Sequence, residues 1–277
     1  MADSGPGFCD VLHASLGGDL LAATVQGPYG EPVPATILLV GDTAYIESAQ
    51  ACGLQLTPEA DRDPERASTH GVGELIRTAI QAKARTIVVG LGGSATNDGG
   101  AGLLAALGAE SDPADALRQG PRGLDGRSDV DLTAARESLR GITLVAASDV
   151  DNPLLRLIGA TSVYGPQKGI AEDRKIAVDA MLETLANATD KKLALAKGAG
   201  AAGGLGFALL LLGATRSPGI EMVADAVGLP EKARQAAWWS PEKEPSTSPR
   251  GRERCRTASP RSLLRRYSRA SRWPGRC

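Results

Sequence analysis

The feature that most constrains the fold is a short apolar run that leads into glycines and then into a helix. Residues 88–100 read VVGLGGSATNDGG, and AGLLAALGA follows at 101–109. The apolar run within 85–91 is typical of a strand that is covered on both faces, and 101–109 is typical of a helix. A strand, a glycine-rich loop and a helix in this order indicate an α/β protein with a parallel or mixed sheet.

The remainder of the chain alternates between strand and helix patterns, which supports the α/β interpretation. Apolar runs and periodicity predict a hairpin over 35–48, a helix over 68–84, a buried strand over 141–150, and helices at about 171–188, within 198–214 and over 218–236. Residues 110–137 are predicted to be loop and short helix, and 159–169 a loop of small residues.

The glycine-rich loop is the strongest candidate for a ligand site. Glycines let the backbone approach a ligand closely, and the first N–H groups of a helix suit an anion such as phosphate. Asp98 could hold Mg²⁺ or cap the helix, and a tight turn without a ligand is the alternative for the loop. We expect substrate or phosphate binding by Gly92, Gly93, Ser94, Thr96, Asn97, Gly99 and Gly100.

A second polar segment, ASDVDNP at 147–153, follows another predicted strand. It places Asp149 and Asp151 at the carboxyl end of that strand, where open α/β sheets bind ligands. Paired carboxylates there could hold Mg²⁺ through water. Turn formation is the alternative, and it is the stronger one for Asn152.

A lysine between glycines is a further candidate. GPQKG at 165–169 presents Lys168, which either neutralises a phosphate or carries a solvated charge on a loop. Two matches to the dinucleotide pattern G-x-G-x-x-G/A, at 90–95 and 198–203, lack the acidic residue or the strand that the pattern requires. The chain contains no P-loop motif.

The charge of the chain is unevenly divided. Residues 237–277 hold 11 of the 31 Lys and Arg but 3 of the 32 Asp and Glu, and all three Trp lie after residue 237. A basic, aromatic tail is typical of single-strand nucleic-acid binding, but the acidic body argues against it, so we expect no nucleic-acid partner. Four Cys without metal spacing, no bilayer-length apolar run and no signal-like start predict a cytoplasmic protein with no membrane partner.

Several motifs, taken in order, resemble one known family. They are GPYGEPV, STHGVGELIRTAI, GLGGSATNDGGAGLLAALGA, SDVDNPLL, GATSVYGPQKG, GAGAAGGLGFALLLLGA and PGIEMV. Together they resemble the bacterial glycerate kinases that phosphorylate D-glycerate with ATP. The resemblance covers roughly residues 1–236.

The resemblance implies Mg-ATP phosphoryl transfer to D-glycerate, giving phosphoglycerate. In such chemistry the protein mainly positions groups and neutralises charge. ATP and Mg²⁺ are the implied cofactors, and the oligomeric state stays open, with a homodimer among the options. The implied catalytic residues are Asp149, Lys168 and Asp98, with Asp149 and Asp151 at the metal and with Asp3 and Asn152 added to the substrate-binding set.

The family has two α/β domains, of which the first is split between the chain ends and the second is inserted. We therefore expect a remnant of the split domain at 1–18, the inserted α/β domain at 19–236, and a basic, disordered tail at 237–277. MADSGPG is similar to a family motif, M-A-D-G-G-E-G, that normally lies well inside the chain. On this comparison the first domain is expected to be largely missing.

A change of reading frame near Ala236 is a further hypothesis. Trp has the single codon TGG. If the codons of Trp238, Trp239 and Ser240 are read one base earlier, the shifted frame must contain two valine codons. With permitted third bases the stretch then reads as the family's expected continuation. A truncated and frameshifted chain is expected to have little or no activity. The alternative functions are a non-catalytic remnant of the family and, third, nucleic-acid binding through the tail.

Overall fold

The computed structural model describes residues 4–126 and 129–235, and the chain divides into two units between Ala226 and Val227. Of the second unit, the described part holds helix α10 (Leu229–Gln235). The first unit holds the strands β1 (Asp19–Gln26), β2 (Pro32–Val40), β3 (Thr43–Glu47), β4 (Thr86–Gly90), β5 (Glu110–Ser111), β6 (Val130–Asp131), β7 (Thr143–Ala147) and β8 (Thr215–Ser217). Its helices are α1 (Phe8–Leu16), α2 (Ala49–Cys52), α3 (His70–Gln81), α4 (Ala101–Ala106), α5 (Thr133–Ser138), α6 (Ala160–Lys168), α7 (Lys175–Ala188), α8 (Leu205–Leu211) and α9 (Gly219–Ala226).

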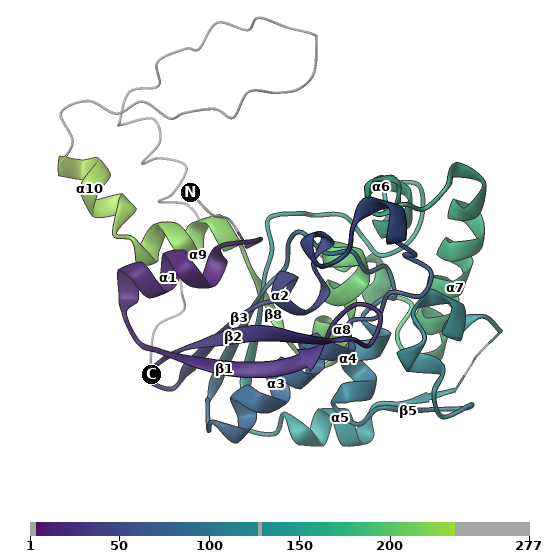
Figure 1. Cartoon of the computed structure of the whole chain (residues 1–277), viewed down its shortest axis with the longest axis horizontal. Helices are drawn as coiled ribbons and strands as arrows, with labels where there is room; N and C mark the ends of the chain where they lie inside the picture. Colours follow the sequence, from purple (N-terminus) through teal and green to yellow (C-terminus); the bar gives the residue numbers. More distant parts are fainter. Residues whose placement is uncertain (1–3, 127–128, 236–277) are drawn as a thin grey trace, which may run out of the picture. The chain divides into compact units, whose positions relative to one another are not determined.

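A six-stranded mixed sheet in the order β1-β2-β3-β4-β7-β8 forms the centre of the first unit (Figure 1). The pairs β1–β2 and β2–β3 are antiparallel, whereas β3, β4, β7 and β8 run parallel to one another. Glu47 pairs with Gly90, Gly90 with Ala147, and Ala147 with Ser217. The carboxyl ends of these four strands therefore lie along one edge of the sheet, where ligands of such folds bind.

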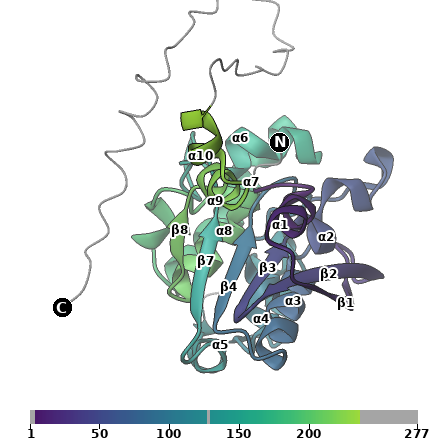
Figure 2. The same cartoon turned by 90° about the vertical axis from the view of Figure 1, so that its left-hand side faces the viewer.

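Strand β4 is covered on both faces, as its apolar sequence predicts. Ile87 and Val89 are buried in the main core, whereas Val88 between them points to the opposite face. On the main-core side, α3 packs on α4 and α4 packs on α8. Helix α1 packs against β2 and β3, and α9 packs beside α1 (Figure 2). Phe8 and Leu12 of α1 are fully buried.

Most of the predicted elements are confirmed. The hairpin is β2–β3, the helix predicted over 68–84 is α3, and the buried strands are β4 and β7. The mixed α/β architecture is likewise confirmed. Residues 19–26, for which no element was predicted, form the edge strand β1, much of which is exposed.

Two predictions are wrong. Residues 159–169, predicted to be a loop, contain helix α6, although Pro166 lies inside it. Its small residues bury Ala160, Thr161 and Gly165, and the helix packs against the glycine-rich turn 201–204. The single helix predicted over 218–236 is two helices, α9 and α10. Gly228 between them has φ +66°, which a continuous right-handed helix does not contain.

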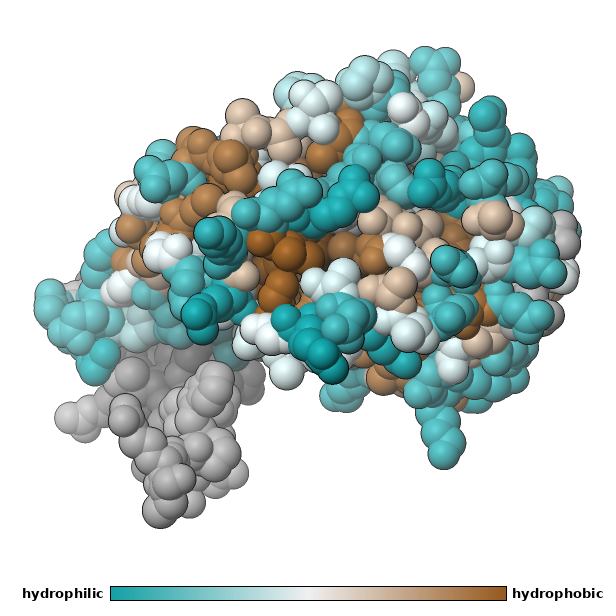
Figure 3. Space-filling view, turned by 90° about the horizontal axis from the view of Figure 1, so that it is seen from below, coloured by the Kyte–Doolittle hydropathy of each residue, from teal (hydrophilic) through white to brown (hydrophobic). Residues whose placement is uncertain are grey.

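The surface of the described residues is mixed in polarity. The face seen from below is mostly hydrophilic, with hydrophobic residues showing between the polar ones near its middle (Figure 3). Scattered exposed apolar side chains are usual for folded domains. No helix within 4–126 and 129–235 is both long enough and apolar enough to cross a membrane.

Candidate active site at the carboxyl edge of the sheet

The glycine-rich loop leaves the sheet directly after β4. A Cβ atom on Gly92 would lie 2.6 Å from Gly5 Cα, and one on Gly90 would lie 2.8 Å from the Ser4 carbonyl oxygen. The Ser4 hydroxyl donates to the Leu91 carbonyl oxygen at 3.3 Å. Glycine is thus required in this part of the loop because the N-terminal segment of the chain lies against its backbone.

The first part of this loop presents backbone N–H groups. In the described part of the chain, the N–H groups of Gly92, Gly93 and Ser94 donate to no other residue. Gly93 is exposed and has φ +67°, a left-handed conformation. Successive N–H groups around a left-handed residue form a concave site for an anion. The structure therefore supports the phosphate-binding expectation most directly at 92–94.

The end of the loop packs against the second glycine-rich segment. The Gly99 N–H donates to the Gly203 carbonyl oxygen at 3.0 Å. A Cβ atom on Gly203 would lie 2.0 Å from the Thr96 carbonyl oxygen, and one on Gly100 would lie 2.3 Å from Ala208 Cβ. Glycine at these positions permits loop-to-loop packing, and the segment at 198–203 acts as the support of the first loop.

Lys168, the last residue of α6, lies beneath the loop rather than in solvent. Its side chain is 2% exposed, and Nζ donates to Ser94 Oγ at 3.0 Å and to the Thr96 carbonyl oxygen at 2.6 Å. Burial lowers the pKa of this amine to about 8, and the nearby Cys52 and Asp98 oppose that shift. The structure thus brings together three predicted site residues, Lys168, Ser94 and Thr96.

Asp98 is fully buried and uses both carboxylate oxygens in hydrogen bonds. Oδ2 accepts from the Thr69 N–H at 2.9 Å, the Thr69 hydroxyl at 2.8 Å and the Gly102 N–H at 3.1 Å. Oδ1 accepts from the Gly100 N–H at 2.9 Å. Burial raises the pKa of Asp98, and these four hydrogen bonds oppose the rise. The geometry favours the capping alternative, in which Asp98 joins the starts of α3 and α4.

Thr96 and Asn97 are also buried under the loop. Asn97 Nδ2 donates to Thr161 Oγ1 of α6 at 3.0 Å. Asn97 Oδ1 has no hydrogen-bond partner within the described residues. Thr96 Oγ1 faces the Cys52 thiol, a weak donor, and has no other partner there. Both side chains contribute to the support of the loop.

The loop after β7 is different, because its carboxylates are exposed. Asp149 follows Ser148 at the end of β7, and its two oxygens accept from the Ile220 N–H of α9 at 3.2 and 3.3 Å. A Cβ atom on Gly219 would lie 3.0 Å from Asp149 Oδ2 and 2.5 Å from Ser4 Cβ. Asp149 therefore stands beside the N-terminal segment that also covers the glycine-rich loop.

Asp151 and Asn152 have partners of their own. Asp151 pairs with Arg216 at 2.8 Å and Lys197 at 3.4 Å. The hydrogen bond from Lys197 and the charge of Arg216 lower the pKa of Asp151. Asn152 donates to the Ile158 carbonyl oxygen at 2.8 Å and accepts from the Tyr164 hydroxyl at 2.7 Å, which favours the turn-forming alternative.

The predicted metal pair is not assembled into a larger ligand cluster. Across residues 4–126 and 129–235, no group of three or more His, Cys, Asp or Glu side chains is placed to hold a metal ion. Asp3, the remaining predicted residue, lies outside the described residues.

Sequence reasoning missed two residues that shape this edge. Glu47 ends β3 and is buried, where it accepts from the N–H groups of Gly7 and Cys9 at 3.0 and 3.4 Å. Burial raises its pKa. Thr69 precedes α3. Its hydroxyl donates to Asp98 and accepts from the Leu103 N–H at 3.0 Å. A glutamate at the end of an apolar strand and a threonine before a helix are the signals that could have identified them.

Comparison with known proteins agrees with this geometry. A model described as the glycerate kinase family matches residues 1–239. A glycerate kinase of Bacillus subtilis (strain 168) is 42% identical over 236 residues, which cover 82% of this chain and 62% of the relative. A glycerate 2-kinase of Escherichia coli (strain K12) is 41% identical over 240 residues, which cover 83% of this chain and 63% of the relative.

A solved structure shares the fold. The crystal structure described as that of a glycerate kinase 2 from Salmonella typhimurium LT2 superposes with a TM-score of 0.77 at 39% identity. The match covers 85% of this chain and 66% of that one. The chain thus spans somewhat less than two thirds of the length of these relatives.

The sheet and its loops define an α/β protein with a glycine-rich site at the carboxyl edge of parallel strands. The chain belongs to the glycerate kinase family. The comparisons bear out neither the predicted truncation nor the predicted change of reading frame near Ala236. Residues 237–277, on which the codon argument and the nucleic-acid alternative rest, lie outside the described residues.

Proposed function

We propose that this protein transfers a phosphoryl group from ATP to D-glycerate. The observation that carries the proposal is the match of residues 1–239 to the glycerate kinase family. Relatives that are 42% and 41% identical are named glycerate kinase and glycerate 2-kinase. The N–H groups at 92–94, at the sheet edge where such folds bind ligands, support an anionic substrate there.

The glycine-rich loop fits the phosphate groups of ATP. The N–H groups of Gly92, Gly93 and Ser94, which have no acceptor among residues 4–126 and 129–235, are the donors proposed for the phosphate oxygens. Lys168 does not reach solvent, so in this proposal it is a positioning residue: its amine fixes Ser94 and Thr96 from below. Its positive charge under the loop adds to the attraction for an anion. Asp98 positions the same loop through the start of α4.

Asp149 fits Mg²⁺ better than Asp151 does. A magnesium ion is usually bound by one or two carboxylates, by water and by substrate phosphates. Asp149 is exposed and accepts a single N–H, whereas Asp151 is already paired with two cations. When bound, Mg²⁺ would neutralise negative charge on the transferred phosphoryl group. A homodimer and a cytoplasmic location also remain proposals, and the proposed phosphoryl transfer depends on neither.

The division of the chain proposed from the sequence also stays a proposal: 1–18 as part of a split domain, 19–236 as the inserted domain and 237–277 as a tail. In the structure, α1 of the first segment packs against β2 and β3 of the second. This packing predicts that the two segments unfold together.

An assay of ADP release by the purified full chain tests the proposed function. We expect release only when ATP, Mg²⁺ and D-glycerate are all present, and no release when propionate, which has the carboxylate but no hydroxyl, replaces D-glycerate. ADP release that is independent of the acceptor would mean ATP hydrolysis and would contradict the proposal. The absence of release under all conditions in a folded sample would contradict it as well.

A further inference from the structure

A pocket of about 420 Å³ lies apart from the glycine-rich loop, between the turn 27–30 that joins β1 to β2 and the segment 118–122. Its volume is within the range of small-molecule sites. The residues that line it include three arginines, Arg66, Arg118 and Arg122, and no Asp or Glu. The pocket is therefore a concentration of positive charge with a wall of mostly neutral polar groups.

One close backbone contact brings the segments that carry the three arginines to the same pocket. Gly120 has φ +67°, and a Cβ atom there would lie 2.6 Å from the Arg66 carbonyl carbon. The segment 118–122 therefore lies directly on the backbone of Arg66. The Arg122 N–H donates to the Glu65 carbonyl oxygen at 3.1 Å, which fixes the register of the contact.

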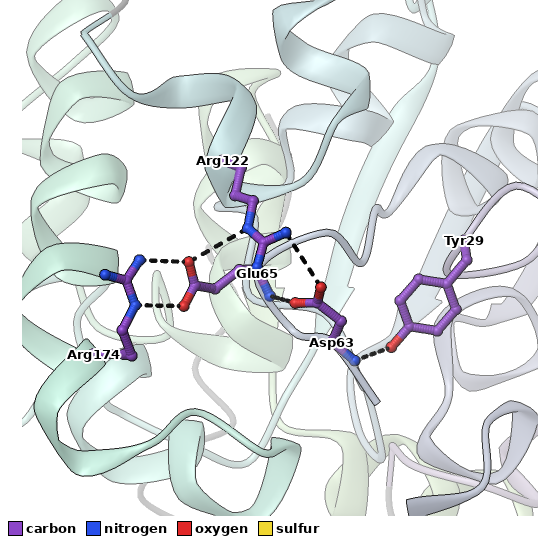
Figure 4. A network of polar contacts seen from close by, with 5 residues as sticks. All are labelled: Tyr29, Asp63, Glu65, Arg122 and Arg174. Atoms are coloured by element: carbon purple, nitrogen blue, oxygen red, sulfur yellow. Dashed lines mark hydrogen bonds and ion pairs between the residues drawn. The ribbon is translucent and has the colours of Figure 1, made fainter. Parts of the chain in front are cut away.

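Arg122 lies between two carboxylates (Figure 4). Its guanidinium lies 3.4 Å from Asp63 Oδ2 and 3.6 Å from Glu65 Oε2. Glu65 also accepts from two nitrogens of Arg174, Nε at 2.8 Å and Nη2 at 2.7 Å, and these hydrogen bonds lower the pKa of Glu65. The two carboxylates next to Arg122 are thus already shared among guanidinium groups.

Arg66 and Arg118 have no such partners. Both side chains are exposed, and neither makes an ion pair or a side-chain hydrogen bond within residues 4–126 and 129–235. The charge of Arg118 reaches His70, whose pKa is lowered first by burial and then by this charge. Both line the same pocket without a counter-charge among the described residues, so an anion bound in that pocket would be stabilised by their charge.

Two other carboxylates behind the pocket wall are engaged elsewhere. Glu31 accepts from the Tyr29 N–H at 3.0 Å, and Glu74 accepts from the Gln26 N–H at 2.7 Å. Neither is within ion-pair distance of Arg66 or Arg118. The wall itself adds neutral donors, the Ser68 hydroxyl and the Gln119 amide.

We propose that this pocket binds a small oxyanion, the carboxylate or phosphate group of a small molecule, through Arg66 and Arg118. Each guanidinium presents a planar fork of N–H donors that matches two oxygens of such a group. Arg122 also lines the pocket, but its charge is paired with Asp63 and Glu65. The site is independent of the proposed phosphoryl transfer, because no residue assigned to that reaction lines it.

Calorimetric titration of the full chain with inorganic phosphate at low ionic strength tests the proposal. The variants are Arg66→Gln and Arg118→Gln, and the matched control is Arg85→Gln, an exposed arginine that also has no side-chain partner in the described residues. We expect saturable binding in the native chain, an affinity about tenfold weaker in each pocket variant, and native affinity in the control. Equal weakening in all three variants, or no saturable binding, would overturn the site.

Two further measurements sharpen this result. Because Arg66 and Arg118 are exposed and unpaired, both variants should keep the native unfolding temperature without phosphate, so a loss of binding cannot be ascribed to misfolding. D-Glycerate and a phosphorylated hydroxy acid are then added as competitors of phosphate. Competition by the first assigns the pocket to carboxylates, and competition by the second alone assigns it to phosphate esters. A chain that binds phosphate here but releases no ADP would contradict the proposed kinase activity and leave this site intact.

Discussion

The loops that follow β4 and β7 end neighbouring parallel strands at the same edge of the sheet, yet they are built in opposite ways. The loop after β4 rests on buried polar groups, including Lys168 and Asp98. The loop after β7 carries Asp149 and Asp151, which are exposed. Buried polar groups are costly to leave unpaired, whereas exposed ones are solvated by water. The first loop is therefore fixed by folding, whereas the exposed carboxylates of the second loop can exchange their present partners for a ligand.

Replacement of Asp98 by Ala should have the largest effect on stability. The substitution removes the acceptor of four hydrogen bonds and leaves the N–H groups of Thr69, Gly100 and Gly102 buried without a partner. We expect the free energy of unfolding to fall by about 4 kcal/mol. Urea denaturation measures it, and a loss below about 1 kcal/mol would show that the loop is not held through Asp98.

A matched pair of glycine substitutions tests the support from the second glycine-rich segment. Gly203 and Gly213 both have positive φ, +72° and +88°, but a Cβ atom meets the Thr96 carbonyl oxygen only at Gly203. Gly213→Ala should cost about 1 kcal/mol of backbone strain. Gly203→Ala should cost about 3 kcal/mol, because the new methyl group displaces the loop. Equal losses in the two variants would remove the argument for loop-to-loop packing.

Lys168 predicts a pH dependence of stability with a definite sign. Its pKa is about 8 in the folded chain against 10.5 for an ordinary lysine. Between these values the unfolded chain binds more protons, so the contribution of Lys168 to the unfolding free energy rises with pH, by about 3 kcal/mol in total.

The measurement is the unfolding free energy of the native chain minus that of Lys168→Met, from pH 7 to pH 10.5. The difference removes the opposing contribution of tyrosines and cysteines whose pKa is raised by burial. A difference that is flat across this window would mean that the amine keeps its ordinary pKa in the folded chain.

The smallest effect on stability is expected at Asp149. Its carboxylate is exposed and accepts one N–H, that of Ile220. Asp149→Asn should change the unfolding free energy by less than about 0.5 kcal/mol, since the amide oxygen can accept the same hydrogen bond. A loss comparable to that of Asp98→Ala would make the two loops equivalent.

Local patterns in the sequence predicted the elements well where one pattern dominated. The apolar run of β4 and the amphipathic period of α3 were sufficient. Helix α6 was not predictable because Gly165 and Pro166 weaken a helix, and its formation depends on packing against the turn 201–204. Edge strand β1 was missed because little of it is buried.

The candidate site was predicted by residue type but not by arrangement. Glycines between a strand and a helix predict an anion site, and the structure leaves the N–H groups at 92–94 without an acceptor among the described residues. The sequence placed Lys168 on a loop, yet its amine bonds to Ser94, which lies 74 positions away along the chain. Asp98 likewise depends on Thr69, 29 positions away. Such partners are brought together by the parallel crossovers, which no local pattern contains.

In the proposed reaction the two loops have different roles: the loop after β4 supports the site, and the loop after β7 supplies its reactive carboxylate, Asp149. The direct test measures ADP release from ATP and D-glycerate, together with the unfolding free energy, for the native chain and Asp149→Asn. The matched control is Asp42→Asn, an exposed aspartate at the opposite edge of the sheet. We predict that Asp149→Asn lowers kcat by roughly 100-fold at unchanged stability, and that the control has native activity. Native activity in a folded Asp149→Asn protein would contradict the account.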